Sequence, residues 1–260
     1  MKIEWVKAKL FRPFLLIGLV AAGFSATAQE EEPDDESVRG SYEKMYYADG
    51  SLKAEGLVVD GQEQGEWKWY YKAGELNAVE YFNHGSLTGE VTHYHQNGQV
   101  KSVENYIDGE LTGDVVYYYE TGQILKKGQY NHDLYDGSWT FYYSSGQLKK
   151  QGQYTGGEPF GRWVMYYENG TIEYEGIFVE GEETGEWKSY YESGSLASMG
   201  KFLNGEEHGH WIYWDENGSK IEEGQFLGSE KVGEWIVYNR KGRVKNRMYY
   251  DLEGSIDVKK

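Results

Sequence analysis

Histidines and clustered carboxylates are the side chains whose spacing in this sequence could support metal binding or catalysis. His93 and His95 lie two residues apart in a β-prone segment, so they would face the same side of a strand, and His84 lies in the segment before them. This spacing suits a zinc or copper ion. The alternative is that both histidines replace aromatic residues found at the same places elsewhere, such as Tyr117 and Tyr119. We favour that alternative and expect no metal site.

Acidic residues gather in segments 60–66 and 180–186. Neither segment has the alternating Asp spacing of a calcium loop. Paired carboxylates also catalyse glycoside hydrolysis, but here they recur along the chain instead of marking one special place. No glycine-rich segment is followed by the Lys-Ser/Thr pair of a phosphate-binding loop. The sequence therefore predicts a protein that is not an enzyme, with no catalytic residue and no cofactor.

The composition narrows the classes of partner. The chain has 43 acidic and 26 basic residues and a formal net charge of −17, which disfavours nucleic acid and anionic membranes as ligands. Because cysteine is absent, disulfides and thiol chemistry are excluded. Aromatic residues make up 17 % of the chain and glycines number 35, a composition typical of short strands joined by tight turns.

The first 28 residues differ from the rest. Four basic residues precede an uncharged, mostly apolar run at 13–28, which ends in the small-residue pattern Ala26-Thr27-Ala28. This run is shorter than the roughly 20 residues of a spanning helix. We therefore expect a cleaved secretory signal at 1–28, a mature chain beginning at Gln29, and export to the periplasm, cell surface or medium. Cleavage would change the formal charge from −17 to −20, and residues 29–40 would form an acidic spacer.

An internal repeat with a period of 24 residues fills positions 41–256 and leaves 257–260 as a tail. Its nine units begin near residues 41, 65, 89, 113, 137, 161, 185, 209 and 233. A tryptophan follows the first glycine of most units, at Trp67, Trp139, Trp163, Trp187, Trp211 and Trp235. A second glycine recurs at Gly74, Gly98, Gly122, Gly146, Gly170, Gly194, Gly218 and Gly242. We expect both sets to be structural.

Each unit has the features of a β-hairpin. In the unit at 185–208, an aromatic strand at 185–191 is followed by a turn at 192–195, a second strand at 196–203 and a polar loop at 204–208. Two glycines per unit argue against helix. Neighbouring hairpins should pair, so the predicted fold class is all-β: an elongated, curved, solenoid-like antiparallel sheet of nine hairpins. About eighteen strands at roughly 4.8 Å would span roughly 85 Å.

Alternation along the strands predicts which side chains share a face of the sheet. Trp187 and Tyr191 should lie on one face, and Tyr190 on the other. Leu196 and Phe202 should share a face on the second strand. Rows of such side chains, stacked from unit to unit, would stabilise the sheet.

The repeated pattern G-x-W-x-x-Y-Y-x-x-G-x-L-x-x-x-G-x-Y-x-x-G resembles the bacterial variant of the MORN repeat across residues 41–256. This resemblance implies an elongated, curved sheet of hairpins that acts as a scaffold. Chains of this kind are often named as antitoxins of toxin–antitoxin systems. The sequence departs from the pattern where Val91 and Val115 replace tryptophan and where Glu80, Glu104 and Met248 replace a glycine.

Two functions are compatible with these features. The first is an exported, non-enzymatic scaffold that binds a protein in an antitoxin- or immunity-like role. The negative charge of the chain favours a basic partner. For it we expect the acidic residues of the inter-unit loops, Glu182, Glu183, Glu206 and Glu207, to form a stripe, and Tyr166 and Tyr190 to supply apolar contact.

The second is a cell-wall or glycan binder, because rows of exposed aromatic rings stack on sugars. The discriminating feature is the exposure of Tyr70, Tyr118 and Tyr166: a sugar binder should leave them open to solvent, whereas a scaffold can cover them.

Overall fold

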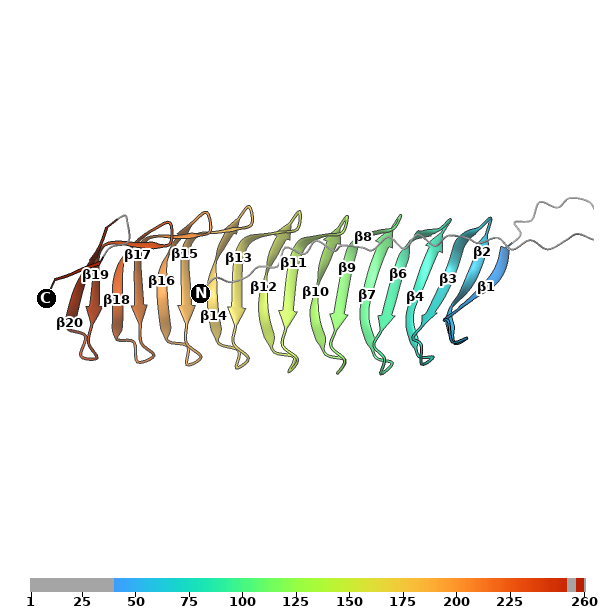
Figure 1. Ribbon diagram of the computed structural model, residues 1–260, viewed down its shortest axis with the longest axis horizontal. Coiled ribbons are helices and arrows are strands. Elements are labelled where there is room, and N and C mark those ends of the chain that lie inside the picture. Colours follow the sequence, from blue (N-terminus) through green and yellow to red (C-terminus); the bar gives the residue numbers. More distant parts are fainter. Residues whose placement is uncertain (1–39, 252–255, 260) are drawn as a thin grey trace, which may run out of the picture.

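The computed structural model describes residues 40–251 and 256–259, which form a single antiparallel sheet (Figure 1). Its strands are β1 (Gly40–Tyr46), β2 (Leu52–Val59), β3 (Gln62–Tyr70), β4 (Leu76–Asn83), β5 (Ser86–Leu87), β6 (Gly89–Tyr94), β7 (Val100–Ile107), β8 (Glu110–Leu111), β9 (Gly113–Tyr118), β10 (Ile124–Asn131), β11 (Leu134–Tyr142), β12 (Leu148–Thr155), β13 (Glu158–Tyr166), β14 (Ile172–Val179), β15 (Glu182–Tyr190), β16 (Leu196–Leu203), β17 (Glu206–Trp214), β18 (Lys220–Leu227), β19 (Glu230–Tyr238), β20 (Val244–Tyr250) and β21 (Ile256–Lys259).

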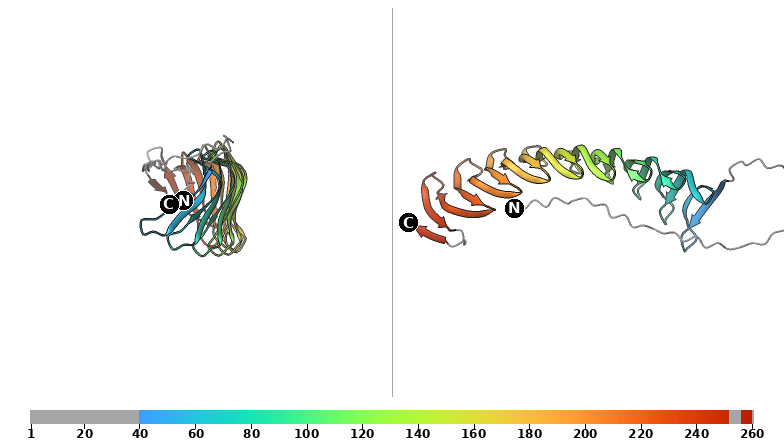
Figure 2. Two further views of the ribbon diagram at one scale, coloured as in Figure 1. Left: turned by 90° about the vertical axis from the view of Figure 1, so that its right-hand side faces the viewer. Right: turned by 90° about the horizontal axis from the view of Figure 1, so that it is seen from above.

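Each strand pairs with its neighbours in the sequence, so the chain runs as one meander along the sheet. β5 with β6, and β8 with β9, are the two parts of strands that elsewhere run without a break. The row of strands is open and curved, as the view from above shows (Figure 2). The predicted fold class, an elongated curved sheet of repeated β-hairpins, is confirmed.

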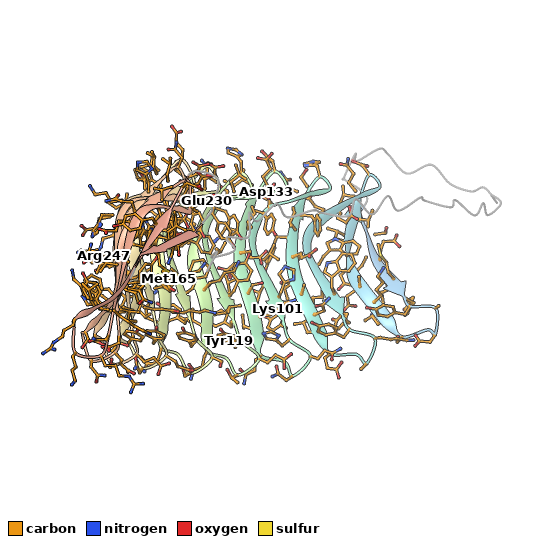
Figure 3. All side chains as sticks on the ribbon, turned by 60° about the vertical axis from the view of Figure 1, so that its left-hand side comes forward. Lys101, Tyr119, Asp133, Met165, Glu230 and Arg247 are labelled. Carbon is orange, nitrogen blue, oxygen red and sulfur yellow. The ribbon has the colours of Figure 1, made fainter. Side chains whose placement is uncertain are left out.

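Two kinds of turn follow the two long margins of the sheet. Turns within a unit lie along what we call the hairpin margin; in one of them Gly194 has a φ of 84°, and its N–H donates to the carbonyl oxygen of Tyr191 at 2.8 Å. Turns between units lie along the inter-unit margin and contain only two residues. Asn204 and Gly205 have φ of 54° and 75°, as type I′ turns require. In Figure 3 the two margins are at the bottom and top of the view.

The short inter-unit turn corrects the prediction of a polar loop at 204–208. Only Asn204 and Gly205 turn the chain, and β17 already begins at Glu206. The same holds one unit earlier, where β15 begins at Glu182 instead of at residue 185. Sequence reasoning placed the boundary at Gly185, which instead sits inside the strand with a φ of 65°, where pairing with β14 shifts register. Glycine is needed at this position because the strand has a β-bulge there, not because the strand begins there.

A second register shift corrects one predicted face. Pairing between β15 and β16 shifts between Ser189, which is opposite Ser198, and Tyr190, which is opposite Leu196. The extra residue, Ala197, interrupts alternation on β16. Leu196 is therefore paired with Tyr190, on the face opposite to Phe202, instead of sharing the face of Phe202.

The core is a row of rings on one face of the sheet, which we call the tryptophan face. Trp67, Trp139, Trp163, Trp187, Trp211 and Trp235 are at most 5 % exposed. Each ring lies over a glycine of the preceding unit: a Cβ built on Gly200 would be 2.0 Å from Cδ2 of Trp211. Aromatic side chains flank the rings edge-on, such as Phe202 at 5.3 Å from Trp211 between centroids.

The glycine–tryptophan contact explains four of the five departures from the repeat pattern, all except Met248. In this contact the glycine precedes the tryptophan by eleven residues, as in Gly200 and Trp211. Val91 follows Glu80, and Val115 follows Glu104, at the same separation. Where the large ring is missing, the neighbouring position no longer needs to be glycine, so the two kinds of departure are one correlated exchange.

Other predictions concern the ends of the chain. The signal segment 1–28 and nearly all of the acidic spacer 29–40 lie outside the described residues. Near the other end, β21 pairs with β20 and adds a strand beyond the last complete hairpin; it begins at Ile256, the last residue assigned to the repeat, and continues into the predicted tail. No helix of membrane-spanning length and apolarity occurs in the part of the chain that the structure describes.

Candidate functional site

The face opposite to the tryptophans is polar and holds the two tyrosines proposed for apolar contact. Tyr190 donates to Oε1 of Glu175 at 2.7 Å, and Arg162 donates to Oε2 of the same carboxylate at 2.7 Å. Tyr166 accepts a hydrogen bond from Nε2 of Gln151 at 3.0 Å. Both rings are half-buried and joined to the preceding unit. Their hydroxyls therefore hold neighbouring hairpins together.

These contacts shift the titration of the groups involved. The pKa of Glu175 lies below its ordinary value, because the hydrogen bonds from Arg162 and Tyr190 favour the carboxylate. Burial, together with the adjacent carboxylate of Glu175, raises the pKa of Tyr190 to about 12. The phenol thus remains a hydrogen-bond donor over the physiological range.

The structure gives each of the two candidate histidines a different role. His95 takes the place of a tyrosine in a ladder along the hairpin margin: its Nε2 contacts the carbonyl oxygen of Tyr118 at 3.0 Å, as the hydroxyl of Tyr71 contacts that of Tyr94 at 2.8 Å. His93 lies instead on the tryptophan face, 3.8 Å from Oε2 of Glu104. Burial lowers the pKa of His93, and Glu104 opposes this shift. Within 40–251 and 256–259, no group of three or more His, Asp or Glu side chains could hold a metal ion.

The four glutamates proposed as one stripe divide between two surfaces. All four lie in β15 and β17 and not in loops. Glu182 and Glu206 are exposed at the inter-unit margin, opposite Val179 and Leu203. Glu183 and Glu207 are half-buried opposite Phe178 and Phe202, whose rings belong to the tryptophan face. Adjacent residues of a strand point to opposite faces, so the single stripe that the sequence predicted does not form.

The inter-unit margin combines acidic and aliphatic side chains. Val179, Leu203 and Leu227 are 49 %, 50 % and 50 % exposed, respectively. Each is paired with a strongly exposed acid across the two-residue turn, at Glu182, Glu206 and Glu230. We call these six residues the acid–aliphatic margin. It repeats at the spacing of the units along three successive hairpins.

A second feature of the tryptophan face is a continuous row of residues that are directly opposite one another on successive strands. We call it the central row: Ala54, Trp69, Ala78, His93, Ser102, Tyr117, Lys126, Phe141, Lys150, Met165, Tyr174, Ser189, Ser198, Tyr213, Glu222, Val237 and Asn246. Within this row, Ser189 and Ser198 are the one neighbouring pair in which both side chains are as small as serine or alanine.

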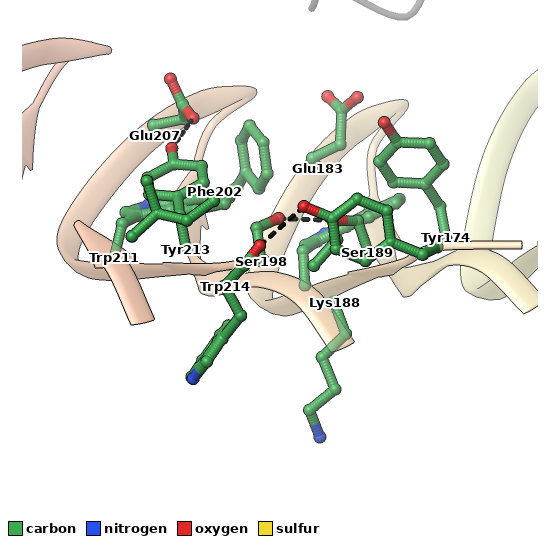
Figure 4. A pocket seen from close by; sticks show the side chains of 14 residues that line it. Tyr174, Glu183, Lys188, Ser189, Ser198, Phe202, Glu207, Trp211, Tyr213 and Trp214 are labelled. Carbon is green, nitrogen blue, oxygen red and sulfur yellow. Dashed lines mark hydrogen bonds between the residues drawn. The ribbon is translucent and has the colours of Figure 1, made fainter. Parts of the chain in front are cut away.

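The two serines leave a cavity of about 330 Å³, which we call the serine cavity. Tyr174 and Tyr213, the next members of the central row, stand at its two sides (Figure 4). The serine hydroxyls share a hydrogen bond of 2.6 Å. Glu183 and Glu207 lie at the rim, and the hydroxyl of Tyr213 is 3.4 Å from Oε1 of Glu207.

Sequence reasoning missed this cavity, although the sequence carries its signal. Ser189 occupies the position held by Phe141 two units before, and Ser198 the position held by Lys150. A comparison of these two positions across the units would have shown that only this unit has a small residue at both of them. Strand register was needed to show that the two positions face each other.

An open meander of hairpins, stabilised by rows of stacked rings, is the architecture of a repeat scaffold. The chain belongs to the MORN repeat variant family, whose model matches residues 63–84, 87–108, 111–132, 135–155, 161–180, 183–204 and 207–227. These matches cover more than half of the sequence and are in register with the 24-residue units.

Comparison with solved structures gives distant likenesses. A TcdB2-TccC3-Cdc42 crystal structure has 12 % sequence identity and a TM-score of 0.21, and the match covers 84 % of this chain and 14 % of the other. A Photorhabdus luminescens Tc holotoxin pore with the TccC3-D651A mutation has 12 % identity and a TM-score of 0.20, covering 80 % of this chain and 14 % of the other. The chain thus spans a small part of these proteins. No curated protein matches the sequence.

Proposed function

We propose that this protein is an exported, non-enzymatic scaffold that binds a basic protein through its acid–aliphatic margin. The observation that carries the proposal is the repeated pairing of exposed aliphatic and acidic side chains on three successive units. Apolar side chains of this kind supply the area buried in a complex, and the acids around them set the sign of the partner's surface.

The chain's overall charge favours the same partner class. A formal net charge of −17 steers a basic surface toward the protein and repels nucleic acid and anionic lipid. The interaction should be sensitive to salt, since exposed charges act within a Debye length of about 8 Å at physiological ionic strength. An immunity- or antitoxin-like role, in which the partner is a toxin, is one form of this function. Residues 1–28 would then export the chain to a compartment outside the cytoplasm.

Site-specific photo-crosslinking tests the proposal directly. A photoreactive amino acid at position 203, on the acid–aliphatic margin, is compared with the same amino acid at exposed Ser193 on the hairpin margin. Crosslinking in the cells that make the protein should give a discrete protein adduct from position 203 and none from position 193. Equal adducts from both positions would show that the acid–aliphatic margin is not the binding surface.

Charge reversal supplies a matched test with the crosslinked partner. Changing Glu182, Glu206 and Glu230 to Lys should slow association and reduce its dependence on salt. The control reverses three exposed acids of the hairpin margin, Glu120, Glu168 and Glu192, and so changes the net charge equally. If the control slows association as much, net charge and not the acid–aliphatic margin governs binding. Co-sedimentation with anionic vesicles instead of protein capture would also contradict the proposal.

The alternative function, binding of a cell-wall glycan, depends on open aromatic rings. Tyr70, Tyr118 and Tyr166 are half-buried on the polar face, and Tyr70 donates to Oε1 of Glu55 at 2.7 Å. Rings in this state offer less stacking area than a sugar platform needs. The serine cavity is the other place with aromatic walls, so neutral sugars are included in its test below.

A further inference from the structure

We infer that the serine cavity is a receptor for one lysine or arginine side chain of the basic protein partner. This inference rests on the proposed function and identifies a second contact on the tryptophan face, separate from the acid–aliphatic margin. It follows from the size of the cavity, from the charge at its rim and from the lysines that the chain has at equivalent positions in other units.

The size of the serine cavity suits a single side chain. Binding pockets for small molecules span about 300–1,000 Å³, and this one, at about 330 Å³, is at the lower end. Its walls are aromatic: Tyr174 and Tyr213 flank it, and Trp187, Phe202 and Trp211 line its interior. Such walls hold the methylene stem of a long side chain and attract a cation at its tip.

The chain supplies its own cations at equivalent points of the same face. The Lys126 ammonium lies 4.2 Å from the ring centroid of Tyr117 and 5.5 Å from that of Trp139. Lys150 lies 4.5 Å from the ring centroid of Phe141 and 5.7 Å from that of Trp163. Both lysines occupy the position that Ser198 holds in the serine cavity.

Lys231 shows the same recognition with a carboxylate added. It occupies the position that Glu207 holds one unit earlier, and its ammonium lies 3.8 Å from the ring centroid of Trp235 and 2.9 Å from Oε1 of Glu222. Aromatic rings and a carboxylate thus already bind an ammonium group on the tryptophan face. In the serine cavity the rings and carboxylates are present, but the lysine positions hold Ser198 and Glu207.

No lysine or arginine of the described residues places its charge inside the serine cavity. Lys188 contributes to the lining, but its ammonium points away from Glu183 and Glu207 (Figure 4) and pairs with Oε1 of Glu186 at 2.8 Å. Among the described residues, Lys188 is thus the one basic residue of the lining, and it does not face the two carboxylates of the rim. Burial also raises the pKa of Glu207, and the hydrogen bond from Tyr213 and the charge of Lys231 oppose this shift only in part.

Binding of short peptides tests the inference without knowledge of the partner. The probes are acetylated Gly-Lys-Gly and Gly-Arg-Gly amides, and their uncharged counterparts with norleucine or citrulline. The readout is the NMR shift of the Trp187 and Trp211 indole N–H groups, which belong to residues that line the cavity. We expect saturable shifts from the lysine or arginine peptide and affinity at least about tenfold weaker for the uncharged counterparts.

Two pairs of variants separate the serine cavity from general charge attraction. Glu183→Gln with Glu207→Gln should weaken peptide binding about tenfold, whereas Glu168→Gln with Glu192→Gln, exposed at the hairpin margin, should not change it. Ser198→Lys should abolish binding, because its ammonium would take the place that Lys150 fills two units before. Asn246→Lys, at the equivalent position of the last unit, adds the same charge outside the cavity and should leave binding intact.

Several results would overturn the inference. Equal binding of norleucine and lysine peptides would show that charge is not recognised. Equal loss in the two double glutamine variants would reduce the effect to net charge. Tighter binding of N-acetylglucosamine at the same indoles would assign the cavity to sugars, and tighter binding of cadaverine would assign it to small amines.

The outcomes for the cavity and for the scaffold can be told apart. If Ser198→Lys still binds the crosslinked partner with wild-type affinity, the serine cavity takes no part in the complex, while the proposed function stands. If no partner is crosslinked at position 203 but lysine peptides still bind at the indoles, the cavity is a cation receptor and the proposed margin is wrong.

Discussion

The contact between Gly200 and Trp211 should contribute strongly to the stability of the sheet, although glycine has no side chain. A Cβ at position 200 would lie 2.0, 2.2 and 2.4 Å from three ring atoms of Trp211. No backbone strain opposes alanine there, because Gly200 lies in the extended strand β16 without a positive φ. Gly200→Ala must therefore act by displacing the ring.

The cost follows from what the ring would lose. Trp211 is 5 % exposed, stands edge-on to Phe202 and Phe226, and donates from Nε1 to the carbonyl oxygen of Lys201 at 3.1 Å. Removing a buried tryptophan costs about 3–5 kcal/mol. We expect Gly200→Ala to cost a similar amount, and the double variant with Trp211→Ala to cost no more than Trp211→Ala alone.

Urea unfolding, combined with hydrogen exchange of the strands around the substitution, measures these differences. Gly194→Ala is the control: its φ is 84°, nothing lies within 4 Å of the added Cβ, and it should cost only about 1–2 kcal/mol of backbone strain. Additive effects of Gly200→Ala and Trp211→Ala would refute the reasoning, because independent losses would mean that the added methyl group does not displace the ring.

Four further predictions follow from the repeat and its hydrogen bonds. Deleting residues 137–160 removes one whole unit and should leave a folded sheet by circular dichroism, whereas deleting 137–148 should destabilise it strongly; equal loss of structure would contradict a modular stack. Tyr167→Phe removes a 2.8 Å hydrogen bond to the carbonyl oxygen of Tyr190 and should cost about 1 kcal/mol in urea unfolding. Glu175 has a lowered pKa in the folded chain, so its contribution to stability is present above the ordinary carboxyl pKa and is lost as the pH falls through the folded value. Glu175→Gln should therefore reduce the loss of stability at acid pH, and an unchanged acid dependence would show that this carboxylate does not cause it. Intact-mass measurement of exported protein should give a chain beginning at Gln29, and retention of Met1 would contradict cleavage.

The periodicity predicted the fold well, because each unit repeats the same local chemistry. Glycines at turns and tryptophans at buried places have one physical explanation each, and the period of 24 residues fixes their order. The strand boundaries were harder to predict, since a glycine at a bulge and a glycine at a turn both require positive φ. Gly185 was therefore taken as the start of a strand that begins at Glu182.

The surfaces were harder to predict than the fold, because they depend on register. Glu182 and Glu183 are chemically identical neighbours, yet one lies on the acid–aliphatic margin and the other at the serine cavity. No local property of the sequence distinguishes them. The distinction comes from their partners across the turn, Val179 and Phe178, and from the bulge that sets which of them faces the rings.

The tryptophan face has two rows that tolerate substitution differently: the row of glycine–tryptophan contacts and the central row. This difference allows a binding site to arise without loss of the fold. A glycine and the tryptophan eleven residues later must change together, as Glu104 and Val115 do, because one fills the space that the other leaves. The central row is more variable: residues as different as Trp69, Lys126 and Ser198 are all paired within it. A binding site can therefore arise in one unit by substitutions in the central row, while the glycine–tryptophan contacts continue to hold that unit to its neighbours.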